Sequence, residues 1–308
     1  MKQKISVILC THNPREEALS RTLESLRSQN LDQTHWELLL IDNRSEIAVE
    51  GRFDVSWHQN GRIIVESELG LTAARLRGIR ESEADVLCFV DDDNELAADY
   101  LEQAVKIGRE RPYLGCWGGE ILPEYETPPP PWFHGYEDML VVRPLERDQW
   151  GNAYRYDGAA PCGAGMCIRR EVVDEYFAQC SDSTLRKSLD RIGTSTSSGG
   201  DIDMAFTAID IGMGMGRFKA MRLLHLIPSG RLKSDYLARL AEGMAESNVF
   251  LSYVRHKHPE NYSGVAPLHV KLLFWIRWLR SPKERKVILL GQRRGRARGC
   301  KRLEELRR

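Results

Sequence analysis

Three consecutive aspartates, Asp91, Asp92 and Asp93, directly follow the apolar run at residues 86–90. Such a run is typical of a buried strand, which delivers the residues after it to the edge of an α/β sheet where ligands bind. Adjacent carboxylates repel one another there unless a divalent cation lies between them. The cluster therefore indicates a site that holds a nucleotide diphosphate through a metal ion, and a solvated acidic turn is the alternative.

The elements that must position this cluster alternate between strands and helices over the first 120 residues. The pattern predicts strands at residues 5–10, 38–41, 63–65 and 86–90 and helices around 19–26, 71–80 and 97–109. This alternation favours a mostly parallel sheet with helices on both faces. Polar residues follow three of the strands: Thr11 with Asn13, Asp42 with Asn43, and the three aspartates. We expect these strand ends to meet at one edge and form a ligand site.

The second half of the chain has a different pattern. Residues 123–157 show no regular period, which indicates a functional loop or a surface linker. A flexible Gly/Ser segment at 193–200 ends at Asp201, ahead of a predicted helix over 202–211. A strand is expected over 217–226, with His225 near its end, and residues 232–258 are expected to be helical.

Charge is distributed unevenly, although the 308-residue chain has a net charge of zero. From residue 268 onward, fourteen basic residues stand against three acidic ones, so this tail carries +11 and the rest of the chain −11. A basic tail suggests an anionic partner, either a membrane or a nucleic acid, and the acidic body disfavours nucleic acid. Seven cysteines without a CxxC pair argue against a disulfide framework or a zinc ribbon. A cytoplasmic compartment fits best, and the first residues lack the features of a signal peptide.

Several motifs, in order and in register, resemble those of family 2 glycosyltransferases over roughly residues 4–230. They are the opening segment 5–13, the pair 42–43, and the segments 70–75, 89–94, 163–166, 200–204 and 225–228. The resemblance implies a GT-A nucleotide-diphospho-sugar transferase fold and a nucleotide-sugar donor. It also implies a Mn²⁺ or Mg²⁺ cofactor and transfer with inversion at the anomeric carbon.

Individual roles also follow from the resemblance. Thr11, Asn13 and Asp42 would contact the base and ribose, and Arg75 would lie near the nucleotide. Asp91 and Asp92 would face the nucleotide sugar, with Asp91 reaching the ribose, while Asp93 and His225 would hold the metal. From the residues alone, Asp42 could equally cap a turn, Arg75 could be a solvated helix residue, and His225 could be a structural hydrogen-bonding residue.

Asp201 matches the aspartate that serves the family as catalytic base. A carboxylate within hydrogen-bond reach of the acceptor hydroxyl can remove its proton during attack. The family often has glutamate before this aspartate, whereas this chain has Gly200, so Asp203 competes for the role. A helix N-cap is the structural alternative for Asp201.

The basic tail begins with Leu268, Leu272, Trp275, Ile276 and Leu279 at helical spacing. This stretch is too short to span a bilayer, but tryptophans at an apolar and basic boundary suit a membrane surface. A helix packed on the body, or a dimer contact, followed by a disordered basic segment is the alternative.

The sequence thus predicts a GT-A catalytic domain over 1–230 and a basic helical extension over 231–308. The nucleotide-sugar half of the domain would cover about 1–122, and the acceptor half about 123–230. The predicted function is metal-dependent, inverting sugar transfer to a glycan or lipid-linked acceptor in polysaccharide assembly. The enzyme would be cytoplasmic, at the inner face of the membrane through residues 268–308, with no nucleic-acid partner. A silent nucleotide-sugar or glycan-binding module and a sugar nucleotidyltransferase are the alternatives.

Overall fold

The computed structural model describes residues 4–156, 158–181, 183–256 and 268–306. The chain forms two compact units. Unit 1 contains residues 1–124, 141–182 and 201–227, and unit 2 contains residues 125–140, 183–200 and 228–308. The chain passes from unit 1 to unit 2 for the last time between Ile227 and Pro228, and two earlier segments also belong to unit 2.

The first half of unit 1 is a parallel sheet, as its apolar runs predict. Its strands are β1 (Ile5–Thr11), β2 (Trp36–Asp42), β3 (Gly61–Val65) and β4 (Val86–Asp91). They lie in the order β3-β2-β1-β4, and every neighbouring pair is parallel. Strands β1 and β2 are buried along their whole length, which explains why they are apolar at successive positions rather than alternate ones.

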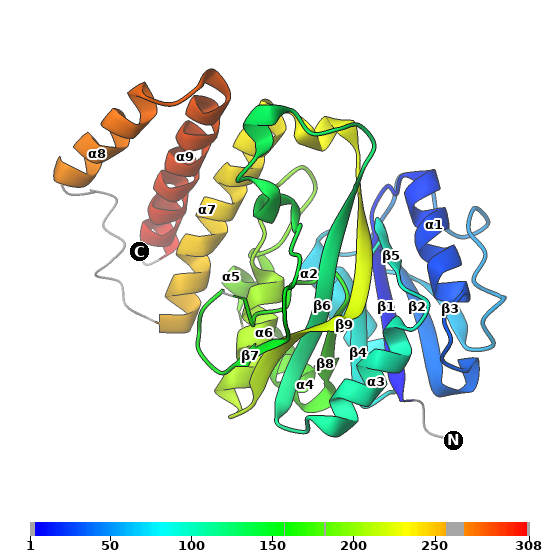
Figure 1. Ribbon diagram of the computed structural model, residues 1–308. Coiled ribbons are helices and arrows are strands. Elements are labelled where there is room, and N and C mark those ends of the chain that lie inside the picture. Colours follow the sequence, from blue (N-terminus) through cyan, green and yellow to red (C-terminus); the bar gives the residue numbers. More distant parts are fainter. Residues whose placement is uncertain (1–3, 157, 182, 257–267, 307–308) are drawn as a thin grey trace. The chain divides into compact units, whose positions relative to one another are not determined.

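The sheet continues beyond β4 with antiparallel strands (Figure 1). These are β5 (Asn94–Leu96), β6 (Leu114–Tyr125), β7 (Gln149–Gly151), β8 (Met166–Arg169) and β9 (Gly214–Ile227). The order continues β8-β6-β9-β5, and β7 pairs with β9. The long β9 brings His225 back to the region of the acidic cluster, because its end pairs with β5.

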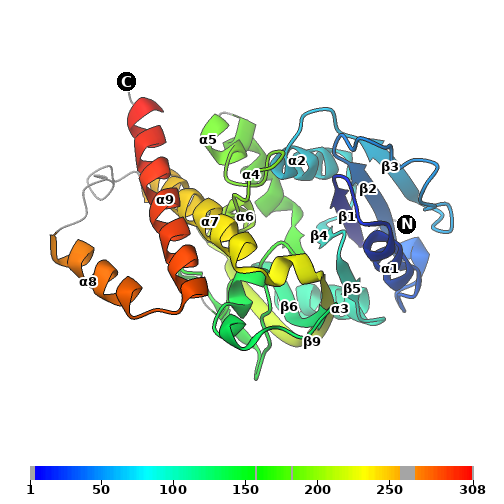
Figure 2. The same ribbon diagram turned by 90° about the horizontal axis from the view of Figure 1, so that it is seen from above.

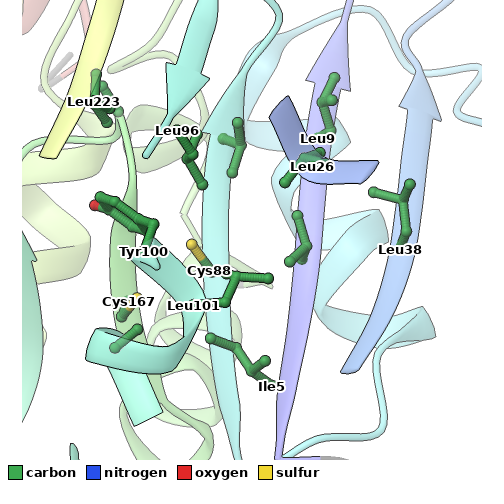
Figure 3. Close-up of a cluster of buried hydrophobic side chains, with 14 of the residues drawn as sticks. Ile5, Leu9, Leu26, Leu38, Cys88, Leu96, Tyr100, Leu101, Cys167 and Leu223 are labelled. Atoms are coloured by element: carbon green, nitrogen blue, oxygen red, sulfur yellow. The ribbon is translucent and has the colours of Figure 1, made fainter. Parts of the chain in front are cut away.

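Helices cover both faces of this sheet, as expected. Helices α1 (Glu16–Arg27) and α3 (Tyr100–Glu110) pack on one face. Figure 3 shows part of that core, where Leu26, Tyr100 and Leu101 meet strand residues such as Leu9 and Cys88. Helices α2 (Leu71–Glu81), α4 (Arg170–Ser181) and α6 (Gly200–Asp210) contribute to the core on the other face. The prediction of a mixed α/β GT-A-type sheet is confirmed.

Unit 2 is built from helices. It contains the short 3-10 turns Pro131–Phe133, Glu137–Leu140 and Ser229–Leu232 and the one-turn helix α5 (Thr184–Lys187). Its long helices are α7 (Ser234–His256), α8 (Leu268–Leu279) and α9 (Lys283–Leu306). The first two of these 3-10 turns lie within the segment without sequence period, and isolated turns carry no period to detect.

The basic segment after Pro282 is helical rather than disordered, because α9 packs closely along α7. Three glycines of α9, four residues apart, face α7: Gly291, Gly295 and Gly299. A Cβ atom at Gly295 would overlap the carbonyl oxygen of Glu242, so a larger residue would push the helices apart. Three arginines of α9 pair with two glutamates of α7: Arg294 and Arg298 with Glu242, and Arg298 and Arg302 with Glu246.

These ion pairs account for part of the tail's positive charge. Three of its fourteen basic residues are held against α7 inside unit 2 and serve the fold. None of the helices in the described ranges combines the length and apolar character needed to cross a membrane.

Candidate functional site

The polar strand ends of unit 1 lie side by side. In the parallel register Thr11 is opposite Asp42, and Cys10 is opposite Asp91. The ends of β1, β2 and β4 therefore form one edge, as their order along the sheet requires. The acidic cluster and the two preceding polar motifs meet there.

The acidic turn is held by its neighbours on both sides. The hydroxyl of Thr11 donates a hydrogen bond to Asp92 Oδ2. The side chain of Asn94 accepts from the backbone N–H of Asp91 at 3.3 Å and donates to Asp93 Oδ1 at 3.2 Å. These contacts keep the carboxylates in fixed orientations, so in this structure Thr11 orients the acidic cluster.

The predicted metal ligands Asp93 and His225 are brought together. Asp93 Oδ2 lies 3.5 Å from His225 Nε2, and each residue is less than a tenth exposed. The three-residue strand β5 produces this contact, because it begins directly after Asp93 and its Asn94 is opposite His225 in β9. The backbone N–H of Leu226 also donates to the carbonyl of Asp93 at 2.9 Å.

The donor set of this pair suits a metal that is shared with the substrate. Within residues that the structure describes, no group of three His, Cys, Asp or Glu side chains forms a metal site. A carboxylate and an imidazole supply two ligands, and a hard cation with so few protein ligands takes the remainder from water or substrate phosphates. The residues therefore fit a divalent ion that binds together with a nucleotide diphosphate.

Asp42 organises the loop that follows its own strand. Its two carboxylate oxygens accept backbone N–H groups of Ser45 and Val49, both at 3.0 Å. Asn13, which has a φ of 50°, joins the same loop: its N–H donates to Ser45 Oγ, and its Oδ1 accepts from the N–H of Glu46. The turn-capping interpretation of Asp42 is thus present in the structure, and any contact with a base would use its remaining lone pairs.

Asn43 is a connecting residue to which the motif analysis gave no separate role. Its Nδ2 donates to the carbonyl of Glu68 at 2.7 Å, and its Oδ1 accepts from the N–H of Gly70 at 2.8 Å. Gly70 has a φ of 145° and is the residue before helix α2. Asn43 therefore fixes the start of the helix that carries Arg75. In the sequence, the signal that could have identified Asn43 was its position directly after Asp42 at the end of a strand.

Asp201 and Arg75 flank the same backbone segment. Asp201 is half-buried in the first turn of α6; its Oδ2 accepts from Gly163 N–H at 2.8 Å, and its Oδ1 accepts from Ile202 N–H at 2.9 Å. Arg75 is buried, with its guanidinium so close to Gly163 that a Cβ atom there would overlap it. The same Cβ atom would lie 3.4 Å from the side chain of Asp201, so the segment 163–166, predicted as a motif of the site, is where a fixed carboxylate and a buried cation come together.

The competition between Asp201 and Asp203 has a structural basis. Asp203 is completely buried, whereas Asp201 is half-buried. A base that takes a proton from an acceptor must be reachable, so this difference favours Asp201. The departure at Gly200 is also explained: its N–H donates to Asp190 Oδ1 at 3.0 Å, and a Cβ atom at 200 would overlap that carboxylate.

The pKa of the buried Cys162 thiol depends on the charged groups around it, which include Asp201 and a residue of the acidic cluster. Burial raises the pKa of Cys162 to about 11; Arg143 and Arg217 oppose the rise, and Asp201 and Asp91 add to it. Asp201 and Asp91 therefore both act on the pKa of this one thiol. Arg143 is anchored nearby by a hydrogen bond to the carbonyl of Ala160 at 2.8 Å. It comes from the segment without sequence period, so no pattern pointed to it.

A parallel half-sheet with an acidic turn at its edge, continued by antiparallel strands, defines the nucleotide-sugar transferase class known as GT-A. The model of the glycosyl transferase family 2 matches residues 6–177, more than half of the chain. The chain therefore belongs to the glycosyl transferase family 2, and the resemblance seen in its sequence is confirmed.

Curated relatives are glycosyltransferases of different kinds. Polypeptide N-acetylgalactosaminyltransferase 8 of Drosophila melanogaster is 35% identical over 107 residues, which is 33% of this chain and 18% of that protein. Glycosyltransferase AglE of Haloferax volcanii is 28% identical over 104 residues, covering 33% of this chain and 34% of that protein. An N-acetylglucosaminyltransferase of Bradyrhizobium diazoefficiens is 26% identical over 185 residues, covering 57% and 37%. The matched regions thus span well under half the length of these relatives.

Solved structures support the fold. GalNAc-T7, crystallised with UDP, GalNAc and Mn²⁺, superposes with a TM-score of 0.53 at 16% identity, covering 81% of this chain and 51% of that one. Residues 1–349 of TarS from S. aureus also give a TM-score of 0.53, at 13% identity, covering 96% of this chain and 90% of that one. At such identities the likeness concerns the architecture alone.

Proposed function

We propose that this chain is an inverting, metal-dependent glycosyltransferase that moves a sugar from a nucleotide-diphosphate donor to a hydroxyl group of an acceptor. The observation that carries the proposal is the acidic edge of the sheet, where Asp93 lies 3.5 Å from His225, together with Asp201 held against Gly163 beside Arg75 in the same unit. A base and a diphosphate site must face opposite sides of one anomeric carbon during a single displacement. Family membership and the GT-A fold support the donor class.

In this reaction the acceptor oxygen attacks the anomeric carbon while the bond to the donor's β-phosphate oxygen breaks. Asp201 takes the acceptor proton, and the electron pair of the broken bond goes to the nucleoside diphosphate. Arg75, a buried cation beside Gly163, would stabilise the charge that develops on the leaving group. Asp42 and Asn13 would shape the pocket for the base through the loop that they hold.

Asp93 and His225 are the residues that would hold the metal. When bound, the ion would neutralise charge on the diphosphate as it leaves. An imidazole ligand favours Mn²⁺ over Mg²⁺. Because this pair supplies only two ligands, we expect metal affinity to be weak without the nucleotide and strong with it. GalNAc-T7 was crystallised with both UDP and Mn²⁺, which supports this combination.

The proposal includes a glycan or lipid-linked acceptor of polysaccharide assembly and a cytoplasmic enzyme at an anionic membrane surface through residues 268–308. Membership of the glycosyl transferase family 2 supports a glycan acceptor class. The unequal distribution of charge in the sequence supports the membrane position.

Thermal-shift measurements with UDP and GDP, each with and without Mn²⁺, test the donor site first. We expect one nucleoside diphosphate to stabilise the protein clearly more when Mn²⁺ is present. Donor hydrolysis in the absence of an acceptor then tests catalysis with the matching nucleotide sugar. A protein that binds the nucleotide but never cleaves the donor, with or without a glycan acceptor, would be a binding module, and the proposed activity would be wrong.

A further inference from the structure

Helix α8 presents a broad apolar face to its surroundings. Large side chains at positions 272, 273, 275, 276 and 279 fall on one side of the helix at the spacing of an amphipathic face. Their exposed fractions are 60% for Leu272, 63% for Leu273, 41% for Trp275, 38% for Ile276 and 66% for Leu279. Isolated exposed apolar residues are ordinary, whereas a contiguous group of this size marks an interaction surface.

The opposite side of α8 is held by α9, which fixes the direction of the exposed face. The guanidinium of Arg293 lies 5.3 Å from the centre of the Phe274 ring, and Lys286 Nζ lies 5.0 Å from that of Trp278. In both views of unit 2, α9 lies between α8 and α7 (Figures 1 and 2). The apolar face therefore points away from the helical pair that forms the core of unit 2.

The charge around this face is positive. Residues 268–283 contain no acidic residue, and two exposed arginines lie beside the apolar group, Arg277 on α8 and Arg280 directly after it. Trp275 lies at the edge of the apolar group, because the guanidinium of Arg293 in α9 lies 5.1 Å from the centre of its ring. Amphipathic helices with tryptophan and leucine on one side and basic residues next to them bind the headgroup region of anionic bilayers.

A cavity of about 260 Å³ adjoins the basic side of α8 within unit 2. Its lining residues are His134, Gly135, Tyr136, Met139, Arg277, Arg285, Ile288, Leu289 and Gln292. Partial burial raises the pKa of the Tyr136 phenol, and the nearby Arg285 and Arg277 oppose that rise. Glu137 is engaged by His134 at 3.2 Å and by the N–H of Gly135 at 2.6 Å. Two guanidinium groups and a phenol therefore remain as donors toward the cavity.

Guanidinium groups bind phosphate oxygens with two parallel hydrogen bonds, which is the strongest donor geometry that proteins offer to this ligand. We propose that α8 lies in the surface of an anionic phospholipid bilayer, with its apolar face in the acyl region, and that the cavity of Arg277, Arg285 and Tyr136 takes a lipid headgroup phosphate. This inference deepens the membrane position in the proposed function, because it assigns the contact to α8 and to Arg285 in the first turn of α9, and leaves Arg294, Arg298 and Arg302 to the fold.

The test is co-sedimentation of the full chain with vesicles of phosphatidylcholine alone or mixed with phosphatidylglycerol. We expect the affinity for the mixed vesicles to be at least about tenfold higher than that for phosphatidylcholine alone, and to fall when salt is added. The double variants Leu272→Gln/Leu279→Gln and Arg277→Gln/Arg285→Gln should each lose about tenfold or more in partitioning. Leu306→Gln, at the last residue of α9 and 63% exposed, is the matched control and should bind like the wild type.

Equal binding by the wild type and both double variants would overturn the proposal. So would a dimer, seen by analytical ultracentrifugation, that Leu272→Gln/Leu279→Gln abolishes, because α8 would then be a self-association surface. A thermal shift from inorganic phosphate that Arg277→Gln/Arg285→Gln lacks, in a protein that does not bind the mixed vesicles, would show that the cavity holds free phosphate and would refute the headgroup assignment. Donor hydrolysis in solution should stay unchanged in all these variants, so a failure here is distinguishable from a failure of the proposed catalytic activity.

Discussion

Replacing Asp201 with asparagine should separate donor binding from sugar transfer. The amide keeps the size of the carboxylate but cannot take the acceptor proton. A positioned general base typically contributes ~10²–10⁴-fold, which corresponds to about 2.7–5.4 kcal/mol of activation free energy. We expect Asp201→Asn to lose at least about a hundredfold in turnover while its affinity for the donor remains.

The structure also predicts a side effect on stability. Both Asp201 oxygens accept backbone N–H groups, from Gly163 and from Ile202. An asparagine has one oxygen, so its NH₂ group must face one of these donors, at a cost of about 1–3 kcal/mol in the free energy of unfolding. The stability effect must therefore be measured separately from the catalytic one.

The assay is release of the nucleoside diphosphate from the donor, well below the melting temperature of each variant, with donor binding measured by calorimetry. Asp174→Asn, at an exposed site on α4, is the matched control and should behave like the wild type. Turnover by Asp201→Asn within a factor of a few of the wild type would refute the assignment. If Asp203→Asn alone lost turnover without unfolding, the buried aspartate would be the base instead.

Three further predictions concern the metal, acidity and the helical pair. Asp93→Asn should abolish the Mn²⁺-dependent part of the thermal shift given by a nucleoside diphosphate; an unchanged shift would remove Asp93 from the metal site. Burial lowers the pKa of His58 to about 4 from 6.5, so the unfolded chain binds the proton first as the pH falls. The free energy of unfolding should drop by up to about 3 kcal/mol between pH 6.5 and 4, and His58→Gln should flatten that slope in urea titrations. Gly295→Ala should destabilise the protein although alanine favours helices, whereas Gly230→Ala, where a Cβ meets open space, should be nearly neutral in the same titrations; the reverse order would contradict the close helix contact.

The sequence was sufficient to predict the parallel half of the sheet and the acidic edge. Strands β1 and β2 are buried along their whole length and β4 along most of it, so their apolar runs stand out, and the rule for strand ends brings Thr11, Asp42 and Asp91 together. Only the roles of these residues as ligand contacts remain predictions.

Other features had no local signal. Strand β5 has three residues, too few for any period, yet it sets the contact between Asp93 and His225. Asp190 lies ten positions before Gly200, and nothing near either residue indicates their hydrogen bond. The sequence of α9 is rich in glycine and arginine, which suggests disorder unless its partner is known. Glu242 and Glu246 of α7 make it an ordered helix.

The close packing of α7 against the three glycines of α9 has a practical consequence for handling this protein. Shortening the chain before residue 283 to test membrane attachment would strip α7 of the helix that covers it. Two carboxylates would lose their counter-ions, and apolar side chains such as Val249 and Phe250 would become accessible to water. A shortened protein that aggregates, or that sediments with membranes, would then report on damage to its interior and not on lipid affinity. Point changes on the outer surface of α8 avoid that confusion.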